Sequence, residues 1–276
     1  MNTVMSQQSQ TRQRTQSDLM DPARAAAMHA ALDLSGPAPK LGDPLPPFWH
    51  YAYFWESLPP AGLGRDGHPR RGGLIPDLGL PRRMWAGGTL EFLEPVRLGE
   101  MAEKRSTLGD AVRKDGRSGP LGVVSLHHEL VQGGRVCVRE VQNLLYREEA
   151  DPDGPAPVPP VAPTDEVVCK TRKFSTTDLF RYSALTFNGH RIHYDRDYAR
   201  TVEGYPGLIV HGPILAQMLI DLAGGLLGGV QRFSFLATAP LFDFETVDFC
   251  ARPDGDGVRL WARGPDGRMC MSAEAG

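Results

Sequence analysis

The sequence predicts an α+β protein with two related antiparallel sheets, and three observations carry this prediction. Residues 89–148 and 230–275 alternate apolar and polar side chains and are broken by Asp-Gly and Gly-Gly turns, as hairpins are. Residues 213–229 (PILAQMLIDLAGGLLGG) are apolar on all sides, which is typical of a helix buried in a core. Residues 151–166 contain six prolines, which lack a backbone donor and fix φ, so this segment separates two halves.

This proline-rich linker gives the predicted domain organisation. The first half covers residues 20–150 and the second half residues 167–276, and each has the size of an ordinary domain. Residues 1–19 are polar and lack the apolar region of a secretory signal. Because they offer nothing to bury, we expect a disordered tail there.

The first half is expected to place a strand meander behind an aromatic segment. Residues 47–58 (PFWHYAYFWESL) predict a short helix that packs on the sheet. Residues 59–83 are rich in Gly, Pro and Arg and predict a loop. The expected strands lie in residues 89–99, 101–113, 121–132 and 135–148, with turns at 114–122 and at Gly133-Gly134.

The second half is expected to open with a strand in residues 166–175. Ser175 or Thr176 can cap a following helix, whose apolar side chains recur at helical spacing as far as Phe187. Four antiparallel strands are expected after the buried helix, joined by turns that contain PDGDG and GPDG.

Composition excludes several classes of function. The net charge of -3 and the pI of about 6.2 argue against general binding to nucleic acid, which needs a basic face. No apolar run approaches the ~20 residues of a membrane helix, so no membrane partner is expected. The four cysteines show no CxxC or other zinc-like spacing, so we expect reduced thiols, no metal and a cytoplasmic location.

A dense polar segment, residues 182–195 (YSALTFNGHRIHYD), precedes His211 and Gly212 at the start of the buried helix. The first N–H groups of a helix lack intrahelical acceptors and carry partial positive charge, so they can stabilise an oxyanion. These parts suit the addition of water to an α,β-unsaturated thioester. His193 would shuttle the proton, Gly212 would hold the thioester oxygen, and Asn188 would orient the water through its amide oxygen.

The segments YSALTFNGHRIHYD and GYPGLIVHGPILAQML resemble the hydratase motif of MaoC-like, R-specific enoyl-thioester hydratases. That motif has an acid or amide, a histidine five residues later, and a His-Gly pair that opens the helix of a hotdog fold. Asn188, His193 and His211-Gly212 match these positions. The resemblance implies a double hotdog of two antiparallel sheets, each wrapping a central helix, with the catalytic residues in the second half.

The first half is similar to the non-catalytic hotdog of a narrower branch, through RMWAGGTLEFLEPVRLGE, DGRSGPLGVVSLHHEL and VQNLLYRE. That branch contains the itaconyl-CoA and mesaconyl-CoA (3-methylfumaryl-CoA) hydratases, and the resemblance covers residues 20–276. It implies reversible hydration of a short, branched dicarboxylic enoyl-CoA to citramalyl-CoA. It implies no cofactor other than coenzyme A as part of the substrate.

Asn188 departs from the broad family, which usually has Asp at this position. An amide cannot accept a proton as a base. Either His193 is therefore the only base, or an acid such as Asp195 or Asp178 assists it. The narrower branch also carries Asn here, so the site is expected to be active.

Several other residues are candidates for substrate contacts. Arg191 could hold a second carboxylate of the substrate or a CoA phosphate, or it could pair with Asp195 or Asp197. The acyl group is expected to contact further residues of the same region, namely Tyr182, Tyr194, His211 and Trp85. The candidates for binding CoA phosphates are Arg172, Lys173, Arg82 and Arg83.

Two alternatives remain open at this point. The enzyme could be a 3-hydroxyacyl-thioester dehydratase of fatty-acid type. It could instead be a hotdog thioesterase, although such enzymes usually carry a carboxylate on the central helix, and here only Asp221 is present, late in the run. Because a double hotdog supplies internally the pairing that single hotdogs obtain by dimerising, both a monomer and a homodimer are compatible with the sequence.

Overall fold

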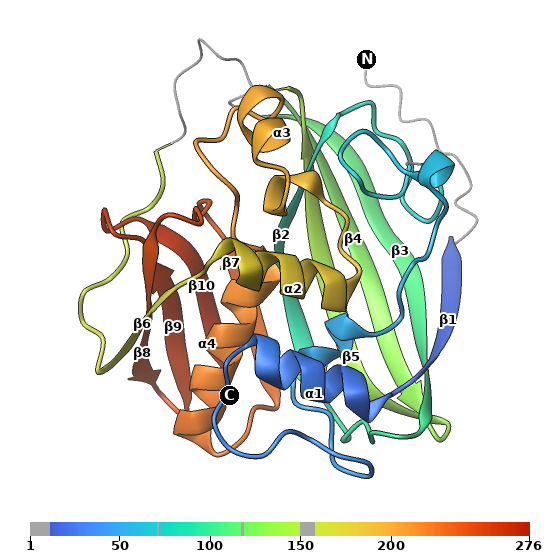
Figure 1. The fold of residues 1–276 in the computed structure, drawn as a ribbon, viewed down its shortest axis with the longest axis vertical. Coiled ribbons are helices and arrows are strands. Elements are labelled where there is room, and N and C mark those ends of the chain that lie inside the picture. Colours follow the sequence, from blue (N-terminus) through green and yellow to red (C-terminus); the bar gives the residue numbers. More distant parts are fainter. Residues whose placement is uncertain (1–11, 71, 117–118, 150–157) are drawn as a thin grey trace, which may run out of the picture.

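The computed structural model describes residues 12–70, 72–116, 119–149 and 158–276. Its strands form one ten-stranded antiparallel sheet in the order β1-β3-β4-β5-β2-β7-β10-β9-β8-β6 (Figure 1). The first half supplies β1 (Gln13–Leu19), β2 (Arg82–Phe92), β3 (Met101–Gly116), β4 (Gly119–Gln132) and β5 (Arg135–Arg147). The second half supplies β6 (Val168–Lys173), β7 (Arg232–Ala237), β8 (Thr246–Asp254), β9 (Gly257–Arg263) and β10 (Met269–Ala275).

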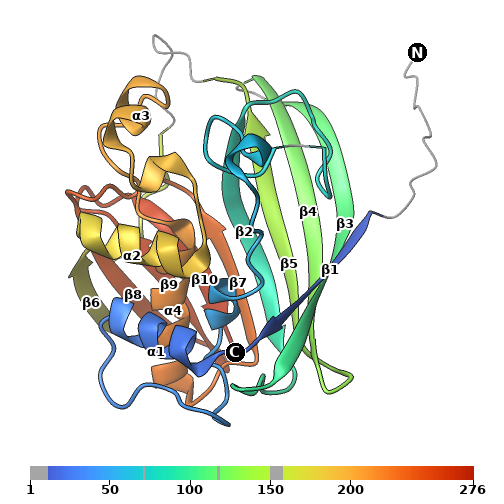
Figure 2. The same cartoon turned by 45° about the vertical axis from the view of Figure 1, so that its right-hand side comes forward.

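The two half-sheets meet where β2 pairs with β7, with Gly87 opposite Leu236 and Glu91 opposite Arg232. Figure 2 shows the half-sheets curving apart from this seam, with the first-half strands on one side and the second-half strands on the other. This confirms the predicted α+β class and the double hotdog. The two predicted sheets form one continuous sheet. The pairing of β2 with β7 covers the strand edge that each half-sheet would otherwise expose.

Helix α4 (Gly212–Leu227) lies inside the curve of the second half-sheet and contacts β7, β8, β9 and β10. Its residues Leu215, Leu219 and Ala223 are buried, and the helix ends at Gly228 in the left-handed region at φ 74°. An all-round apolar sequence therefore forms the predicted central helix. Proline stands at the second position of the helix, where a backbone N–H would have no intrahelical acceptor. The missing N–H of proline therefore costs nothing there, which favours a helix start at Gly212.

The helices of the first half are shorter. Helix α1 (Pro22–Ala31) is capped by Asp21 and packs against α2 (Thr176–Thr186) of the second half. The predicted short helix in residues 47–58 is the four-residue 3₁₀ turn η1 (Trp49–Ala52), which follows Phe48 in the left-handed region at φ 74°. Trp49 is fully buried, so this turn anchors the aromatic segment on the common core, as expected.

The predicted disordered tail is wrong for residues 13–19, which form β1 and pair with β3 along their whole length. Polar residues can still add a strand, since the ladder uses backbone groups and one face stays in solvent. Gln16 also donates a hydrogen bond to the Phe54 carbonyl at 2.8 Å. Residues 1–11 lie outside the described residues.

The predicted loop at 59–83 contains the short 3₁₀ turn η2 (Pro60–Gly62) and ends where β2 begins at Arg82. The described end of the proline-rich linker is attached to the second half-sheet: Val161 bridges to Arg268, and Ala162 packs against Cys250 and Trp261. The rest of the linker, residues 151–157, lies outside the described residues.

Among the described residues, the structure contains no helix that is both long enough and apolar enough to cross a membrane.

Candidate active site

Helix α2 sets the position of the polar segment that follows it. The Ser175 hydroxyl accepts from the Asp178 N–H, and the Asp178 carboxylate accepts from the Ser175 N–H, which makes a reciprocal capping box. The helix ends at Phe187 in the left-handed region at φ 50°, so the chain turns sharply before Asn188. Ser175, not Thr176, is the cap.

His193 lies in the 3₁₀ turn η3 (Arg191–His193) and is buried. Its Nδ1 lies 2.8 Å from the Ile209 carbonyl, which can only accept, so Nδ1 carries the proton and Nε2 keeps its lone pair. Burial lowers the pKa of His193 to about 3, with a further contribution from His190. The imidazole is thus neutral at pH 7 and can accept a proton.

His211 supports His193 from behind. The two rings stack with centroids 3.7 Å apart, and the Ser183 hydroxyl lies 2.8 Å from His211 Nε2. Tyr182 packs against His211 edge-on at 5.0 Å. Since His211 is completely buried and does not line the cleft described below, we interpret it as a residue that positions His193.

Gly212 is the first residue of α4, and its N–H has no intrahelical acceptor by position. A Cβ at Gly212 would lie 2.8 Å from Cε3 of Trp85 and 3.1 Å from its Cζ3. Trp85 itself stacks on Phe235 at 4.5 Å and so cannot retreat easily. Glycine therefore lets the β2 tryptophan touch the N-terminus of α4.

Asn188 uses its side-chain oxygen locally, because Oδ1 accepts from the His190 N–H at 3.0 Å. The oxygen retains a second lone pair, and the amide nitrogen retains its two donors. Asn188 and His193 both line the same cleft, so the structure brings the predicted catalytic pair to one surface.

That cleft has a volume of about 2430 Å³ and lies between the two halves. Its wall includes five of the predicted residues in the polar segment and helix start: Tyr182, Asn188, His193, Tyr194 and Gly212. Trp85 also lines it, and the Tyr194 hydroxyl donates to the Gly189 carbonyl at 2.9 Å. These predicted residues therefore line one cleft, although they come from both halves.

The sequence did not reveal that a first-half loop supports this site. The Arg191 N–H donates to the Asp66 carbonyl at 2.9 Å, and the His68 ring lies 4.5 Å from the His190 ring. Gly67, at φ 85°, presses against Gly189 so closely that a Cβ would overlap the Gly189 carbonyl. Only the tertiary contact identifies this loop, because residues 64–68 carry no catalytic motif.

A buried polar network on the first half-sheet was also missed. His50 Nε2 lies 3.0 Å from a Glu140 carboxylate oxygen, and the Tyr51 hydroxyl donates to the other oxygen. His128 Nδ1 lies 2.7 Å from the Ser106 hydroxyl. These hydrogen bonds indicate a structural role for His128, although this residue also lines the cleft.

The basic candidates differ in their partners. Arg191 binds Asp195 Oδ2 at 2.7 Å, lies over the Tyr198 ring at 4.2 Å and is not among the residues that line the cleft, so the ion-pair alternative matches the structure.

Arg172 donates to the Leu32 carbonyl, and Arg172 and Lys173 are likewise not among the lining residues. Arg82 and Arg83 do line the cleft.

Arg82 is held by Glu203 at 3.2 Å and by the Tyr205 hydroxyl at 2.8 Å. Arg83 is half-buried, and among the described residues its guanidinium has no hydrogen bond or ion pair. Of the four candidates for CoA phosphates, Arg83 is therefore the cation that is both in the cleft and unpaired.

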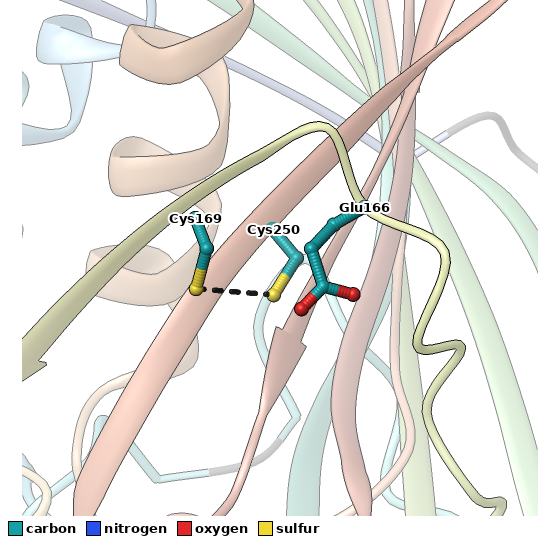
Figure 3. A group of neighbouring side chains, drawn as sticks. All are labelled: Glu166, Cys169 and Cys250. Carbon is teal, nitrogen blue, oxygen red and sulfur yellow. Dashed lines mark hydrogen bonds between the residues drawn. The ribbon is translucent and has the colours of Figure 1, made fainter.

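Figure 3 shows Glu166, Cys169 and Cys250, whose ligand atoms lie within 4.8 Å of one another. Both carboxylate oxygens of Glu166 are bound by Arg263, at 2.7 and 3.1 Å. Burial, reinforced by Cys169, raises the pKa of the Cys250 thiol, which disfavours the thiolate that a metal needs. These contacts give no support to a metal at this cluster.

Comparisons with known proteins identify the family of the chain. The family model described as hydroxyacyl-thioester dehydratase type 2 matches residues 48–243. The chain is 44% identical over 253 residues to the mesaconyl-C(4)-CoA hydratase of Chloroflexus aurantiacus, covering 91% of this chain and 90% of that one.

Two solved structures show the same fold. HtdX of Mycobacterium tuberculosis superposes with a TM-score of 0.70 at 19% identity, over 96% of this chain and 99% of that one. A second M. tuberculosis protein, described as having a double hotdog fold, superposes with a TM-score of 0.57 at 14% identity, over 96% and 95%.

Proposed function

Because the chain belongs to the hydroxyacyl-thioester dehydratase type 2 family, we propose that it catalyses reversible hydration of an α,β-unsaturated acyl-CoA. It is a hydro-lyase, and the 44% identity with mesaconyl-C(4)-CoA hydratase supports enoyl-CoA hydration. The substrate we propose is a short, branched dicarboxylic enoyl-CoA of the mesaconyl type, with itaconyl-CoA as a related candidate and citramalyl-CoA as the hydrated product. We also propose a cytoplasmic location, a monomer or homodimer, and no cofactor beyond the CoA of the substrate.

One observation carries the proposal: a neutral His193 and Gly212, whose N–H at the start of α4 lacks an intrahelical acceptor, line the same cleft. In hydration, Nε2 of His193 accepts a proton from water while the water oxygen attacks the β-carbon. The electrons of the double bond move onto the thioester, and the Gly212 N–H stabilises the enolate oxygen. The proton then returns to the α-carbon, which regenerates neutral His193 and completes the 3-hydroxyacyl thioester.

Asn188 supports this chemistry as a group that orients the water. Its free amide donors, or the second lone pair of Oδ1, can bind the water, while the His190 N–H holds the side chain in place. Asp195 is an unsuitable second base, since its carboxylate caps α3 (Arg196–Thr201) and pairs with Arg191. Asp178 is occupied in the capping box. These contacts favour His193 as the only base.

The thioesterase alternative needs a carboxylate from the central helix in the site. Asp221 accepts from Gln217 at 2.8 Å and is not among the residues that line the cleft. Among the described residues, hydrolysis therefore lacks the carboxylate of the central helix that hotdog thioesterases usually use, whereas the fatty-acid-type dehydratase alternative would use the same residues in reverse.

The test follows the loss of enoyl-thioester absorbance with mesaconyl-C(4)-CoA, itaconyl-CoA and crotonyl-CoA, with a thiol reagent in a parallel assay. We expect absorbance to fall without release of thiol, and fastest for the dicarboxylic substrates. Thiol release without hydration would refute the proposal. Hydration of crotonyl-CoA alone would refute the substrate class and keep the reaction.

A further inference from the structure

A dicarboxylic substrate would bring a carboxylate close to the β-carbon, and the cleft contains one well-placed cation for it. We propose that Arg83 binds the free carboxylate of the acyl group and so selects dicarboxylic thioesters. This inference rests on the proposed function and deepens it, because it assigns to Arg83 the role that the sequence suggested for Arg191.

The register of β2 places Arg83 next to the catalytic residues. Arg83 pairs with Tyr146, Met84 with Leu145 and Trp85 with Leu144, without interruption, and the irregularity of β2 begins only after Trp85. Side chains two residues apart on a strand share a face and lie about 7 Å apart. Trp85 touches the start of α4 at Gly212. Arg83, two residues before Trp85 on the same face of β2, therefore projects into the cleft beside it.

The charge of Arg83 acts on two histidines that line the same cleft. The charge of Arg83 lowers the pKa of both His68 and His190, after the larger effect of burial. The His190 ring in turn lies 5.5 Å from the His193 ring. Both His190 and His193 line the cleft into which the register of β2 directs Arg83.

The charged groups described around Arg83 provide no anion that binds its guanidinium. His68 and His190 are neutral at pH 7, because burial keeps the pKa of His190 at about 3 and that of His68 well below its ordinary value. Among the described residues Arg83 has no ion pair, and two carboxylates of the second half are used elsewhere: Glu203 pairs with Arg82 and Asp195 with Arg191. A half-buried fork of donors then suits a planar carboxylate, which it can bind bidentately.

Arg147, Arg200 and Lys104 also line the cleft, and among the described residues none of these three side chains has a hydrogen bond or ion pair. Arg147 lies opposite Arg82, one residue further from Trp85 than Arg83, and Arg200 is exposed.

Lys104 is the third rival, and burial lowers its pKa. It lies on β3, opposite Leu130, and β3 is separated from β2 by β4 and β5. A carboxylate one bond from the β-carbon could not reach across these strands, so the geometry favours Arg83.

The experiment compares the binding of two saturated thioesters by calorimetry, succinyl-CoA and butyryl-CoA. Succinyl-CoA has a carboxylate where butyryl-CoA has a methyl group, and neither thioester can be hydrated. Wild type should prefer succinyl-CoA. Arg83→Gln should weaken succinyl-CoA binding by about tenfold to hundredfold and leave butyryl-CoA within about threefold. Arg139→Gln, which removes an exposed arginine of the same sheet, should change neither.

Three outcomes would overturn the assignment. Equal weakening of both thioesters in Arg83→Gln would place Arg83 on the CoA portion that they share. Loss of the preference in Lys104→Met, but not in Arg83→Gln, would make Lys104 the anchor. Equal binding of both thioesters by wild type would exclude any carboxylate anchor, and this measurement does not depend on a variant folding.

The outcomes separate this proposal from the proposed function. Failure of wild type to hydrate any enoyl-CoA would refute the function and leave the binding preference standing. Active hydration with no preference for the carboxylate would refute the role of Arg83 alone.

Discussion

At the residue scale, the geometry of the site depends on close contacts and hydrogen bonds of single residues. Gly212 has Trp85 against its Cα, and His193 has one ring nitrogen tied to the Ile209 carbonyl. Both features fix a donor or acceptor before substrate arrives, and such preorganisation is where most catalytic stabilisation arises.

The first prediction concerns Gly212→Ala. Its Cβ would meet the Trp85 ring at 2.8 Å, so Trp85 or the start of α4 must move and the oxyanion donor is displaced. We expect kcat for enoyl-CoA hydration to fall by about tenfold to a thousandfold, as when one oxyanion donor is lost. Steady-state kinetics check this.

Gly224→Ala is the matched control on the same helix, because a Cβ there meets no atom within 4 Å. It should leave kcat unchanged and raise the free energy of unfolding by up to about 1 kcal/mol, since alanine favours a helix. Equal activity of the two variants would contradict the role given to Gly212.

The sequence could propose the second-half site residues because the motif is local. Asn188, His193 and Gly212 line one cleft, and their order along the chain is enough to find them. Arg191 shows the limit of this reasoning. Its partner Asp195 stands four residues later, a spacing that helical neighbours also use, so the sequence left the ion pair and the substrate contact equally open.

At the element scale, the loop of residues 64–68 and the turn η3 act as one support. Arg191 donates through its backbone to the Asp66 carbonyl and through its side chain to the Arg65 carbonyl at 3.2 Å. The first half was predicted to be non-catalytic, and these contacts give it a structural role in the site.

The second prediction is that Gly67→Ala lowers hydratase activity by at least about tenfold, because misplacing catalytic groups by about 1 Å is costly. The new Cβ would overlap the Gly189 carbonyl and push η3 away. Gly36→Ala is the control: its φ of 84° matches the 85° of Gly67, but no atom lies within 4 Å of its Cβ. If both variants lose stability equally and keep their activity, the support is unimportant.

Sequence reasoning could not find this support, nor β1, for one physical reason. Both depend on backbone groups that meet across long separations, and the side chains of residues 13–19 and 64–68 carry little pattern of their own. The strands β3 to β5 and β7 to β10 were found because alternating side chains and turn residues mark them directly, whereas the strand expected at residues 89–99 is β2 at Arg82–Phe92.

At the scale of the whole molecule, five described histidines are held neutral by burial. The pKa values of His128, His190 and His193 are lowered to about 3, and those of His68 and His211 fall well below their ordinary value. The unfolded chain binds protons on these rings below about pH 6.5, and the folded chain does not. Stability is therefore full above pH 6.5 and is lost as the pH falls towards 3.

The third prediction is that the free energy of unfolding decreases between pH 6.5 and pH 4.5, by up to about 1.4 kcal/mol per pH unit for each such histidine. Asp221 opposes this trend, because burial raises its pKa to about 7 and its contribution falls as pH rises from 3.8 to 7. Urea unfolding at several pH values measures the slope.

His128→Ala should reduce this slope, whereas His127→Ala, which removes an exposed histidine of the same strand, should not. A flat profile between pH 4.5 and 6.5 would contradict the assignment of these histidines as buried and neutral.

The central claim is that His193 is the base of a hydratase, and it is tested most directly by the hydration rate of mesaconyl-C(4)-CoA in His193→Ala, with His127→Ala as the control. Losing a general base should lower kcat/KM by about a hundredfold to ten-thousandfold. His127→Ala should remain close to wild type, because that ring is exposed on β4. Activity of a folded His193→Ala protein within a few-fold of wild type would contradict the claim.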